Sequence, residues 1–191
     1  MHRESLTSQA HHWLEDRVFP GDVVIDATAG NGFDTLFLAQ TVGEQGKVFA
    51  FDVQQDAIDN TRRLLTEYQQ QDVVLYHCSH ELMMQQIPEE LHGYVNAIMF
   101  NLGYLPKGDK KLITQSHTTA KALSQAIQIL SEHAVITIIA YPGHPGGRQE
   151  LDMIFEWIDT LDKTSWSIEI VDSLSQSEQS PKLFLIERIK S

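Results

Sequence analysis

The residues best suited to chemistry begin with a glycine-containing turn between an apolar run and a helical pattern. This turn lies within residues 23–35, which read VVIDATAGNGFDT. Gly30 and Gly32 let the backbone turn tightly and approach a ligand without an intervening Cβ. Asp26 ends the apolar run, and we expect it to face the crevice where open α/β sheets bind ligands. The pattern predicts a nucleotide-binding turn, although a structural glycine turn with a capping Asp explains such a motif when it stands alone.

The residues around this turn indicate which nucleotide it binds. A dinucleotide-binding turn reads G-x-G-x-x-G, but Thr35 occupies the third glycine position here. A dinucleotide would also bring its pyrophosphate to the helix N-terminus, where the carboxylates of Asp26 and Asp34 would repel it. S-adenosylmethionine has a sulfonium, an ammonium and a carboxylate but no phosphate, so acidic neighbours are tolerated. We therefore predict S-adenosylmethionine as the cofactor, with Thr28 and Asn31 also lining its site.

Two further segments are expected to hold the adenosine part. Asp52 ends the second apolar run, 20 residues after Gly32, where an acid can accept hydrogen bonds from ribose hydroxyls, and Gln54 follows it. The alternative for Asp52 is an N-cap of the next helix. Ser79 and His80 follow the third apolar run, where methyltransferases contact adenine, although a surface-loop histidine explains His80 equally well.

An asparagine-containing turn after the fourth apolar run is a candidate acceptor site. Residues 100–106 read FNLGYLP, and this order of a polar Asn, a turn at Gly103 and an aromatic ring resembles the N-P-P-Y arrangement of amino-methyltransferases. The Asn101 side-chain oxygen and the Leu102 carbonyl can each accept an N–H of a primary amine, which directs its lone pair at a sulfonium methyl. Tyr104 can stack on a planar base. We assign catalysis to Asn101, Leu102 and Tyr104 and expect Asn101 and Gly103 to contact the cofactor; an Asn-Gly-type turn is the structural alternative.

Polar and basic residues after the later elements are candidate substrate contacts. Thr118 and Thr119 lie near a predicted helix start, where capping is an equally good explanation. His144 and Arg148 belong to a loop rich in Pro and Gly, and they can meet a nucleic-acid phosphate or assist proton removal. Lys107 belongs to the clearest basic cluster, directly after the acceptor turn, where an RNA backbone can pass; a solvated loop is the default explanation.

These motifs lie at the ends of short apolar runs that alternate with helical patterns. Such alternation indicates a parallel sheet with crossover helices. The expected strands are 23–26, 48–52, 73–77, 94–100, 134–141, 166–172 and 182–189, and the expected helices are 5–16, 34–42, 57–70, 112–131 and 148–161. The last two strands follow one another closely and should pair antiparallel. The predicted fold is α/β, a Rossmann-like class I methyltransferase fold whose seven-stranded sheet is mostly parallel, with an antiparallel last strand and helices on both faces.

The composition of the chain limits the number of domains, the cellular compartment and the partners that we expect. The 191 residues fit one domain, which we take to span 1–191. Cys78 is the only cysteine, which excludes an intramolecular disulfide, and the histidines lack zinc-ligand spacing, so no metal is expected. A signal-peptide pattern and an apolar stretch of about 20 residues are both missing, so we expect a cytoplasmic protein without a membrane partner. Lys and Arg total 14 against 26 Asp and Glu, and this net charge of −12 argues weakly against a nucleic-acid partner.

Four segments make the chain resemble a known family. They are 26–32 (DATAGNG), 51–54 (FDVQ), 101–106 (NLGYLP) and 141–147 (YPGHPGG), and the similarity runs in the same order through about residues 5–190. These segments are similar to those of the YtqB/MnmM family, long labelled an rRNA methylase family and now assigned as tRNA 5-(aminomethyl)-2-thiouridine methyltransferases. Segment 179–184 (QSPKLF) departs from the Asn-rich, double-proline version associated with that family.

The resemblance implies transfer of one methyl group from S-adenosylmethionine to the exocyclic primary amine of the modified wobble uridine. It implies 5-methylaminomethyl-2-thiouridine as the product, a tRNA anticodon stem-loop as the partner and a homodimer as the assembly. The alternatives are a methyltransferase for rRNA or a small-molecule amine, and a non-catalytic nucleotide-binding module that would leave segment 101–106 without a purpose. Thr35 and the clustered acids disfavour an NAD-dependent oxidoreductase.

Overall fold

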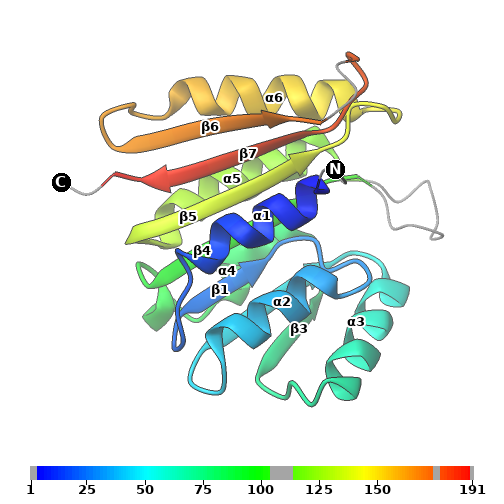
Figure 1. Cartoon of the computed structure of the whole chain (residues 1–191), viewed down its shortest axis with the longest axis vertical. Coiled ribbons are helices and arrows are strands. Elements are labelled where there is room, and N and C mark those ends of the chain that lie inside the picture. Colours follow the sequence, from blue (N-terminus) through cyan, green and yellow to red (C-terminus); the bar gives the residue numbers. More distant parts are fainter. Residues whose placement is uncertain (1–3, 104–113, 174–176, 190–191) are drawn as a thin grey trace.

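Seven strands form one sheet in the computed structural model, which describes residues 4–103, 114–173 and 177–189 (Figure 1). The strands are β1 (Val23–Asp26), β2 (Lys47–Asp52), β3 (Val73–His77), β4 (Val95–Asn101), β5 (Leu130–Ala140), β6 (Trp166–Asp172) and β7 (Lys182–Arg188). The helices are α1 (Leu6–Glu15), α2 (Phe33–Val42), α3 (Gln55–Glu67), α4 (Met83–Gln86), α5 (Ser116–Ile129) and α6 (Gly147–Thr160), with the short 3-10 turns η1 (His80–Leu82) and η2 (Glu89–Leu91).

The sheet has the order β3-β2-β1-β4-β5-β7-β6. The first five strands pair in parallel, and β7 runs antiparallel to both β5 and β6. The prediction of a mostly parallel sheet with an antiparallel last strand is confirmed. Successive crossovers lead outward from β1 in one direction and from β4 in the other, so the chain reverses direction between these two strands. Open α/β sheets bind their ligands beyond the strand ends at such a reversal.

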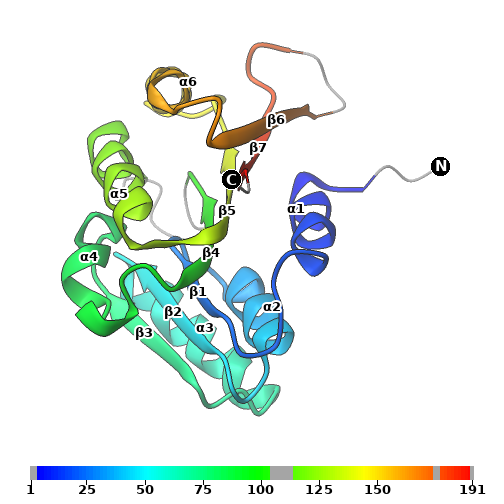
Figure 2. The same ribbon diagram turned by 90° about the vertical axis from the view of Figure 1, so that its left-hand side faces the viewer.

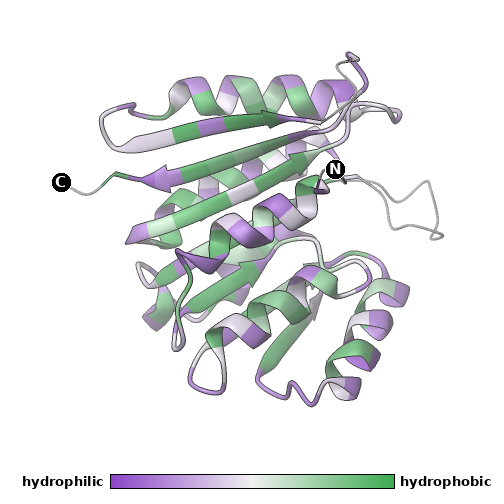
Figure 3. Cartoon of the chain, viewed as in Figure 1, coloured by the Kyte–Doolittle hydropathy of each residue, from purple (hydrophilic) through white to green (hydrophobic). Residues whose placement is uncertain are grey.

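The central strands are buried on both faces, and their side chains alternate between two cores. On β4, Ile98 and Phe100 belong to one core cluster, whereas Ala97 and Met99 belong to the other. Helices α4, α5 and α6 cover the first face, and α1, α2 and α3 cover the second (Figure 2). Hydropathy follows this layering: the strands are mainly hydrophobic, whereas the helices carry hydrophilic residues on their outer sides (Figure 3). The predicted helices on both faces are confirmed.

A close approach between two helices requires one glycine of the turn. Gly32 has a φ of 87° and is the N-cap of α2. A Cβ at this position would lie 2.8 Å from the Cα of Thr61 on α3. Glycine therefore permits both the left-handed backbone and the packing of α2 on α3.

The structure differs from the predicted elements between β3 and β5. Three short helical segments, η1, α4 and η2, were not predicted, because segments of three or four residues carry no periodic signal. Helix α5 begins at Ser116 rather than 112, and residues 112 and 113 lie outside the described residues. Strand β5 begins at Leu130 rather than 134, because its pairing with β4 is irregular: Val95 pairs with Leu130 but Ala97 pairs with Val135. Among the described residues, no helix has the length and apolar character needed to cross a membrane.

Candidate active site

A cavity of about 800 Å³ lies at the carboxyl ends of the parallel strands. Residues at or just after the end of each of β1, β2, β3, β4 and β5 line it, together with parts of α1 and α5. The predicted site residues that line this one cavity are Thr28, Gly30, Asn31, Asp34, Asp52, Gln54, Ser79, His80, Asn101, Leu102, Gly103, Thr118 and His144. The structure thus brings together segments that are up to 116 positions apart, from Thr28 to His144.

Five other predicted site residues do not line the cavity: Asp26, Gly32, Thr35, Thr119 and Arg148. Thr119 is buried and donates to the carboxylate of Glu150 at 2.6 Å, and exposed Arg148 pairs with Asp152 at 3.0 Å. Tyr104 and Lys107 lie outside the described residues.

The prediction that Asp26 faces the crevice is wrong. Its side chain is fully buried, and its carboxylate accepts hydrogen bonds from the backbone N–H of Thr28 at 3.0 Å and the hydroxyl of Thr35 at 2.6 Å. Burial, together with the negative charge of Asp34, raises the pKa of Asp26 to about 7. Thr28 in turn accepts a hydrogen bond from the backbone N–H of Asn101 at 2.7 Å. Asp26 therefore holds the turn after β1 in place, and this turn contacts the end of β4 through Thr28.

Asp52 lines the cavity and also holds the glycine turn. Its Oδ2 accepts the N–H of Gly30 and its Oδ1 accepts the N–H of Gln54, both at 2.9 Å. Gln54, not Asp52, is the N-cap of α3. Burial raises the pKa of Asp52, and the two backbone N–H donors oppose that shift. Each carboxylate oxygen has a second lone pair, so Asp52 can still accept hydrogen bonds from a ligand hydroxyl.

His80 is buried at the cavity wall and is not a surface-loop histidine. Its Nδ1 lies 3.0 Å from the carbonyl oxygen of Ala27, so Nδ1 donates and carries the proton of the neutral ring. Burial lowers the pKa of His80, which keeps the ring neutral. Its Nε2 is a buried acceptor without a hydrogen-bond partner among the described residues. A buried polar atom of this kind at a cavity wall indicates a ligand donor.

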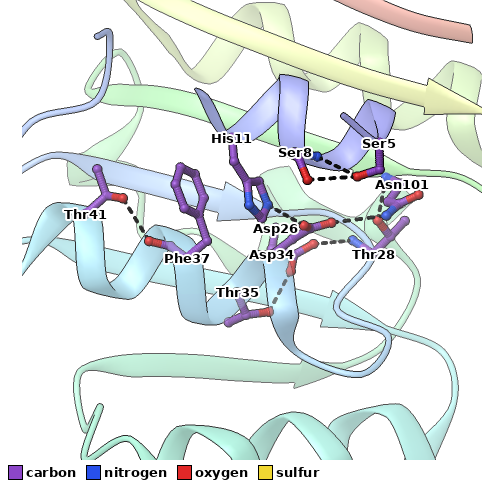
Figure 4. A network of polar contacts seen from close by, with 10 residues as sticks. All are labelled: Ser5, Ser8, His11, Asp26, Thr28, Asp34, Thr35, Phe37, Thr41 and Asn101. Atoms are coloured by element: carbon purple, nitrogen blue, oxygen red, sulfur yellow. Dashed lines mark hydrogen bonds and ion pairs between the residues drawn. The ribbon is translucent and has the colours of Figure 1, made fainter. Parts of the chain in front are cut away.

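The end of the cavity at Asn101 contains a network of polar contacts that the sequence did not reveal (Figure 4). Asn101 donates through Nδ2 to Oδ2 of Asp34 at 3.2 Å, and Oδ1 of Asp34 lies 2.6 Å from Nε2 of His11, within hydrogen-bond distance. The His11 ring stacks on Phe37 with centroids 3.9 Å apart and an interplanar angle of 3°. Helix α1 therefore contacts this end of the cavity through Asp34, and the Asn101 amide is oriented by a carboxylate.

Several cavity-lining residues were not assigned from the sequence. Phe33 has a 65% exposed side chain at the start of α2, Tyr141 follows β5, and Thr7 of α1 shares a hydrogen bond with Tyr141. Phe33 could have been predicted as a cavity residue from the sequence, because it directly follows Gly32 of the glycine turn. No local pattern indicated Thr7, because its hydrogen-bond partner Tyr141 is 134 positions away in the sequence.

A buried carboxylate organises the far side of the acceptor turn. Glu150 of α6 accepts hydrogen bonds from the hydroxyls of Thr114 at 2.8 Å and Thr119 at 2.6 Å. Thr114 also accepts the N–H of Gly103 at 2.9 Å and donates its own N–H to the Gly103 carbonyl at 2.9 Å. Within the described ranges, no group of three or more His, Cys, Asp or Glu side chains is placed to hold a metal ion.

Comparison with known proteins connects this site to a family. The family described as "Putative rRNA methylase" matches residues 48–187. The chloroplastic tRNA (mnm(5)s(2)U34)-methyltransferase of Arabidopsis thaliana is 40% identical over 173 residues, which are 86% of this chain and 62% of the plant protein. The match thus spans less than two thirds of that relative's length.

Solved structures with the same fold cover nearly the whole chain. A protein described as a putative rRNA-methylase from Clostridium thermocellum is 38% identical, with a TM-score of 0.91 over 99% of this chain and 100% of that one. A putative methyltransferase from Streptococcus mutans in complex with SAH is 30% identical, with a TM-score of 0.85 over 98% and 99% of the two chains. The shared fold, and a family match that includes β2, β4 and the acceptor turn, place this chain in the "Putative rRNA methylase" family.

Proposed function

We propose that this protein is an S-adenosylmethionine-dependent N-methyltransferase that acts on the wobble position of tRNA. It converts 5-aminomethyl-2-thiouridine to 5-methylaminomethyl-2-thiouridine. The observation that supports this most strongly is a single cavity with two chemically different ends. One end has the glycine turn, Asp52 and His80, and the other has Asn101 and Leu102 at the end of β4.

The first end suits the adenosine part of the cofactor. The Nε2 of His80 can accept an N–H of the adenine amino group, and Asp52 can accept from the ribose hydroxyls. The Gly30 turn would bring backbone close to the ligand, and the carboxylate of Asp34 on the cavity wall would suit a positively charged sulfonium. S-adenosylmethionine supplies the electrophilic methyl group. The SAH that accompanies the Streptococcus mutans relative is the product that remains after such a transfer.

The second end suits a primary amine. Because the Nδ2 of Asn101 donates to Asp34, its Oδ1 is the atom available to accept an N–H from the amine. The Leu102 carbonyl is the second acceptor in the proposal. Two fixed acceptors orient the nitrogen lone pair toward the methyl group. The third predicted catalytic residue, Tyr104, stays a prediction.

Aromatic side chains at the cavity suit a nucleic-acid base. Phe33 and Tyr141 are 65% and 37% exposed, and both line the cavity. Single-stranded anticodon-loop bases are recognised by stacking on such rings. The named activity of the Arabidopsis relative supports tRNA over rRNA as the substrate. The anticodon stem-loop as the docking element, contacts by Lys107, Thr118 and His144, and a homodimer remain parts of the proposal.

The decisive experiment is a methylation assay followed by mass spectrometry of nucleosides. Bulk tRNA from a strain that lacks the gene is incubated with the purified protein and S-adenosylmethionine. We expect the aminomethyl nucleoside to disappear and the methylaminomethyl nucleoside to appear in stoichiometric amount. Parallel reactions contain rRNA and the free nucleoside. Methylation of either of these, with no change in the tRNA, would replace the proposal by the corresponding alternative.

A further inference from the structure

Asp34 occupies a position between the cavity and the helix that covers it. Its side chain is 7% exposed and lines the cavity, where Oδ2 accepts from Asn101. The other oxygen, Oδ1, is 2.6 Å from Nε2 of His11 on α1 (Figure 4). One carboxylate therefore connects the proposed amine site with an imidazole on a different element.

His11 connects Asp34 with solvent. It does not line the cavity, yet its side chain is 22% exposed. Stacking on Phe37 holds the ring in the plane that allows the contact with Asp34. The pair thus reaches from the amine site at one end to the outside of the protein at the other.

The proposed reaction requires such a connection. An aliphatic primary amine titrates near pH 10, so only about one molecule in a thousand is neutral at pH 7. The ammonium has no lone pair for attack on the methyl group, and one proton must leave before or during transfer. Two carbonyl-type acceptors, such as those of Asn101 and Leu102, bind N–H groups but do not take a proton at this pH.

We propose that the Asp34–His11 pair takes the proton that the acceptor ammonium loses, a role that rests on the proposed amine methylation. The N–H bond breaks and its electron pair stays on nitrogen, while the proton passes to the pair. That electron pair then forms the N–C bond as the C–S bond breaks and its electrons return to sulfur. The proton passes first to Asp34 and then to Nε2 of His11, in the ring tautomer that has its own proton on Nδ1. The ring, now protonated on both nitrogens, releases the Nδ1 proton to solvent.

Other titratable groups near the pair are less suited to this role. Asp26 of β1 is fully buried away from the cavity, and Asp52 of β2 binds two backbone N–H groups at the adenosine end. Burial raises the pKa of Tyr141, which follows β5, so its phenol stays protonated. His144 lines the cavity beside Gly103, where a Cβ would lie 3.8 Å from its Nε2, whereas Asp34 contacts the Asn101 side chain itself.

The remaining charged groups of α1 interact with other partners. His12 contacts Glu15, and Arg17, just beyond the helix, pairs with Glu187 of β7. Asp34 is therefore the carboxylate that faces both Asn101 and an imidazole.

The variant His11→Gln distinguishes a role of His11 in proton transfer from a role in holding Asp34 by a hydrogen bond. A Gln amide can still donate a hydrogen bond to Asp34, but it cannot titrate. We expect kcat on aminomethyl tRNA to fall about 100-fold at pH 7, the usual contribution of a positioned base. The wild-type kcat should reach a plateau with rising pH, whereas the kcat of the variant should keep rising about tenfold per pH unit, because it depends on amine that is already neutral.

His12→Gln is the matched control, because His12 is the exposed neighbour on the same helix. It should keep the wild-type kcat and pH profile. Isothermal titration calorimetry should give the same Kd for S-adenosylmethionine in wild type, His11→Gln and His12→Gln. Asp34→Asn tests the second member of the pair. We expect the double variant with His11→Gln and Asp34→Asn to have a kcat no lower than that of the slower single variant, because the two residues then act as one unit.

Two results would overturn the inference. The first is an unchanged kcat and pH profile in His11→Gln. The second is a weakened cofactor Kd that accounts for the whole loss of activity, which would assign the pair to the amino group of S-adenosylmethionine. The wild type in the same assay keeps the two proposals apart: if it does not methylate aminomethyl tRNA, the proposed function fails, and if it does, the variants test the pair alone.

Discussion

At the scale of single residues, the proposed role of Asn101 predicts that cofactor binding and catalysis respond differently to its substitution. Its amide is held by Asp34 and its backbone N–H by Thr28, so its oxygen has a fixed position at the cavity. We predict that Asn101→Ala keeps its affinity for S-adenosylmethionine but loses about 100-fold in kcat, because a misplaced acceptor nitrogen costs about that much. Calorimetry and single-turnover kinetics measure the two quantities. An unchanged kcat would remove Asn101 from the mechanism.

The raised pKa of Asp26 predicts how the free energy of unfolding depends on pH. Because burial raises its pKa in the folded protein to about 7, the folded state binds more protons than the unfolded chain between about pH 4 and 7. The contribution of Asp26 to stability is therefore fully present below this range and is lost as the pH rises through 7. Asp26→Asn lacks this term, so the difference in unfolding free energy between wild type and variant should change by up to about 1.4 kcal/mol per pH unit.

Urea unfolding at several pH values between about 4 and 8 measures this difference. The comparison cancels the other titrating groups, since both proteins share them. A difference that does not vary with pH would contradict a raised pKa for Asp26.

At the scale of elements, α6 holds the base of the acceptor turn through Glu150. Thr114, just before the start of α5, forms hydrogen bonds with both Gly103 and Glu150. It thereby connects the residues after β4 with α6. In Glu150→Gln, the amide can accept at one atom only, so one Thr hydroxyl loses its partner, which costs about 1–3 kcal/mol. We predict a higher KM for tRNA and a lower kcat, with an unchanged Kd for S-adenosylmethionine.

Glu156→Gln is the control for this variant, because Glu156 lies on the exposed side of the same helix. It should behave as wild type in both assays. A weaker cofactor affinity in Glu150→Gln would show that Glu150 supports the whole cavity rather than its acceptor end.

Most of the helices and strands were predictable from the sequence, and the start of β5 shows why some boundaries were not. Apolar runs such as those of β1 and β4 predict buried parallel strands, because a strand covered on both faces is apolar at every position. The start of β5 was missed because Ser131, Glu132 and His133 are polar and follow α5 directly. The register with β4 shifts across these residues, from the Val95–Leu130 pair to the Ala97–Val135 pair, and no sequence period reports such a bulge.

At the scale of the whole molecule, the sheet order decides where the cavity lies. The reversal between β1 and β4 places the ends of five parallel strands around one space. S-adenosylmethionine bound in this space stabilises the fold by mass action, by about 2.7 kcal/mol at 100 times its Kd. For a domain of this size we predict a rise in Tm of roughly 5–10 °C.

Differential scanning fluorimetry checks this rise, measured for each protein against its own ligand-free Tm. Asp52→Ala should lose most of the rise, because Asp52 holds the turn and faces the ligand. Asp72→Ala, at an exposed position before β3, should keep it. An equal rise in all three proteins would contradict the assignment of Asp52 to the cofactor.

The sequence alone determined the types of residue that meet at the strand ends, the layer architecture and the kind of cofactor that suits acidic neighbours of a glycine turn. These properties depend on local patterns and on the rule that parallel strands share one edge. Tertiary structure decided which way each side chain points and what it meets. Asp26 turns away from the cavity, His80 pairs with a carbonyl 53 positions away, and Asp34 joins His11 and Asn101 across 23 and 67 positions. Contacts of that range depend on how helices pack on the sheet, and no local period encodes them.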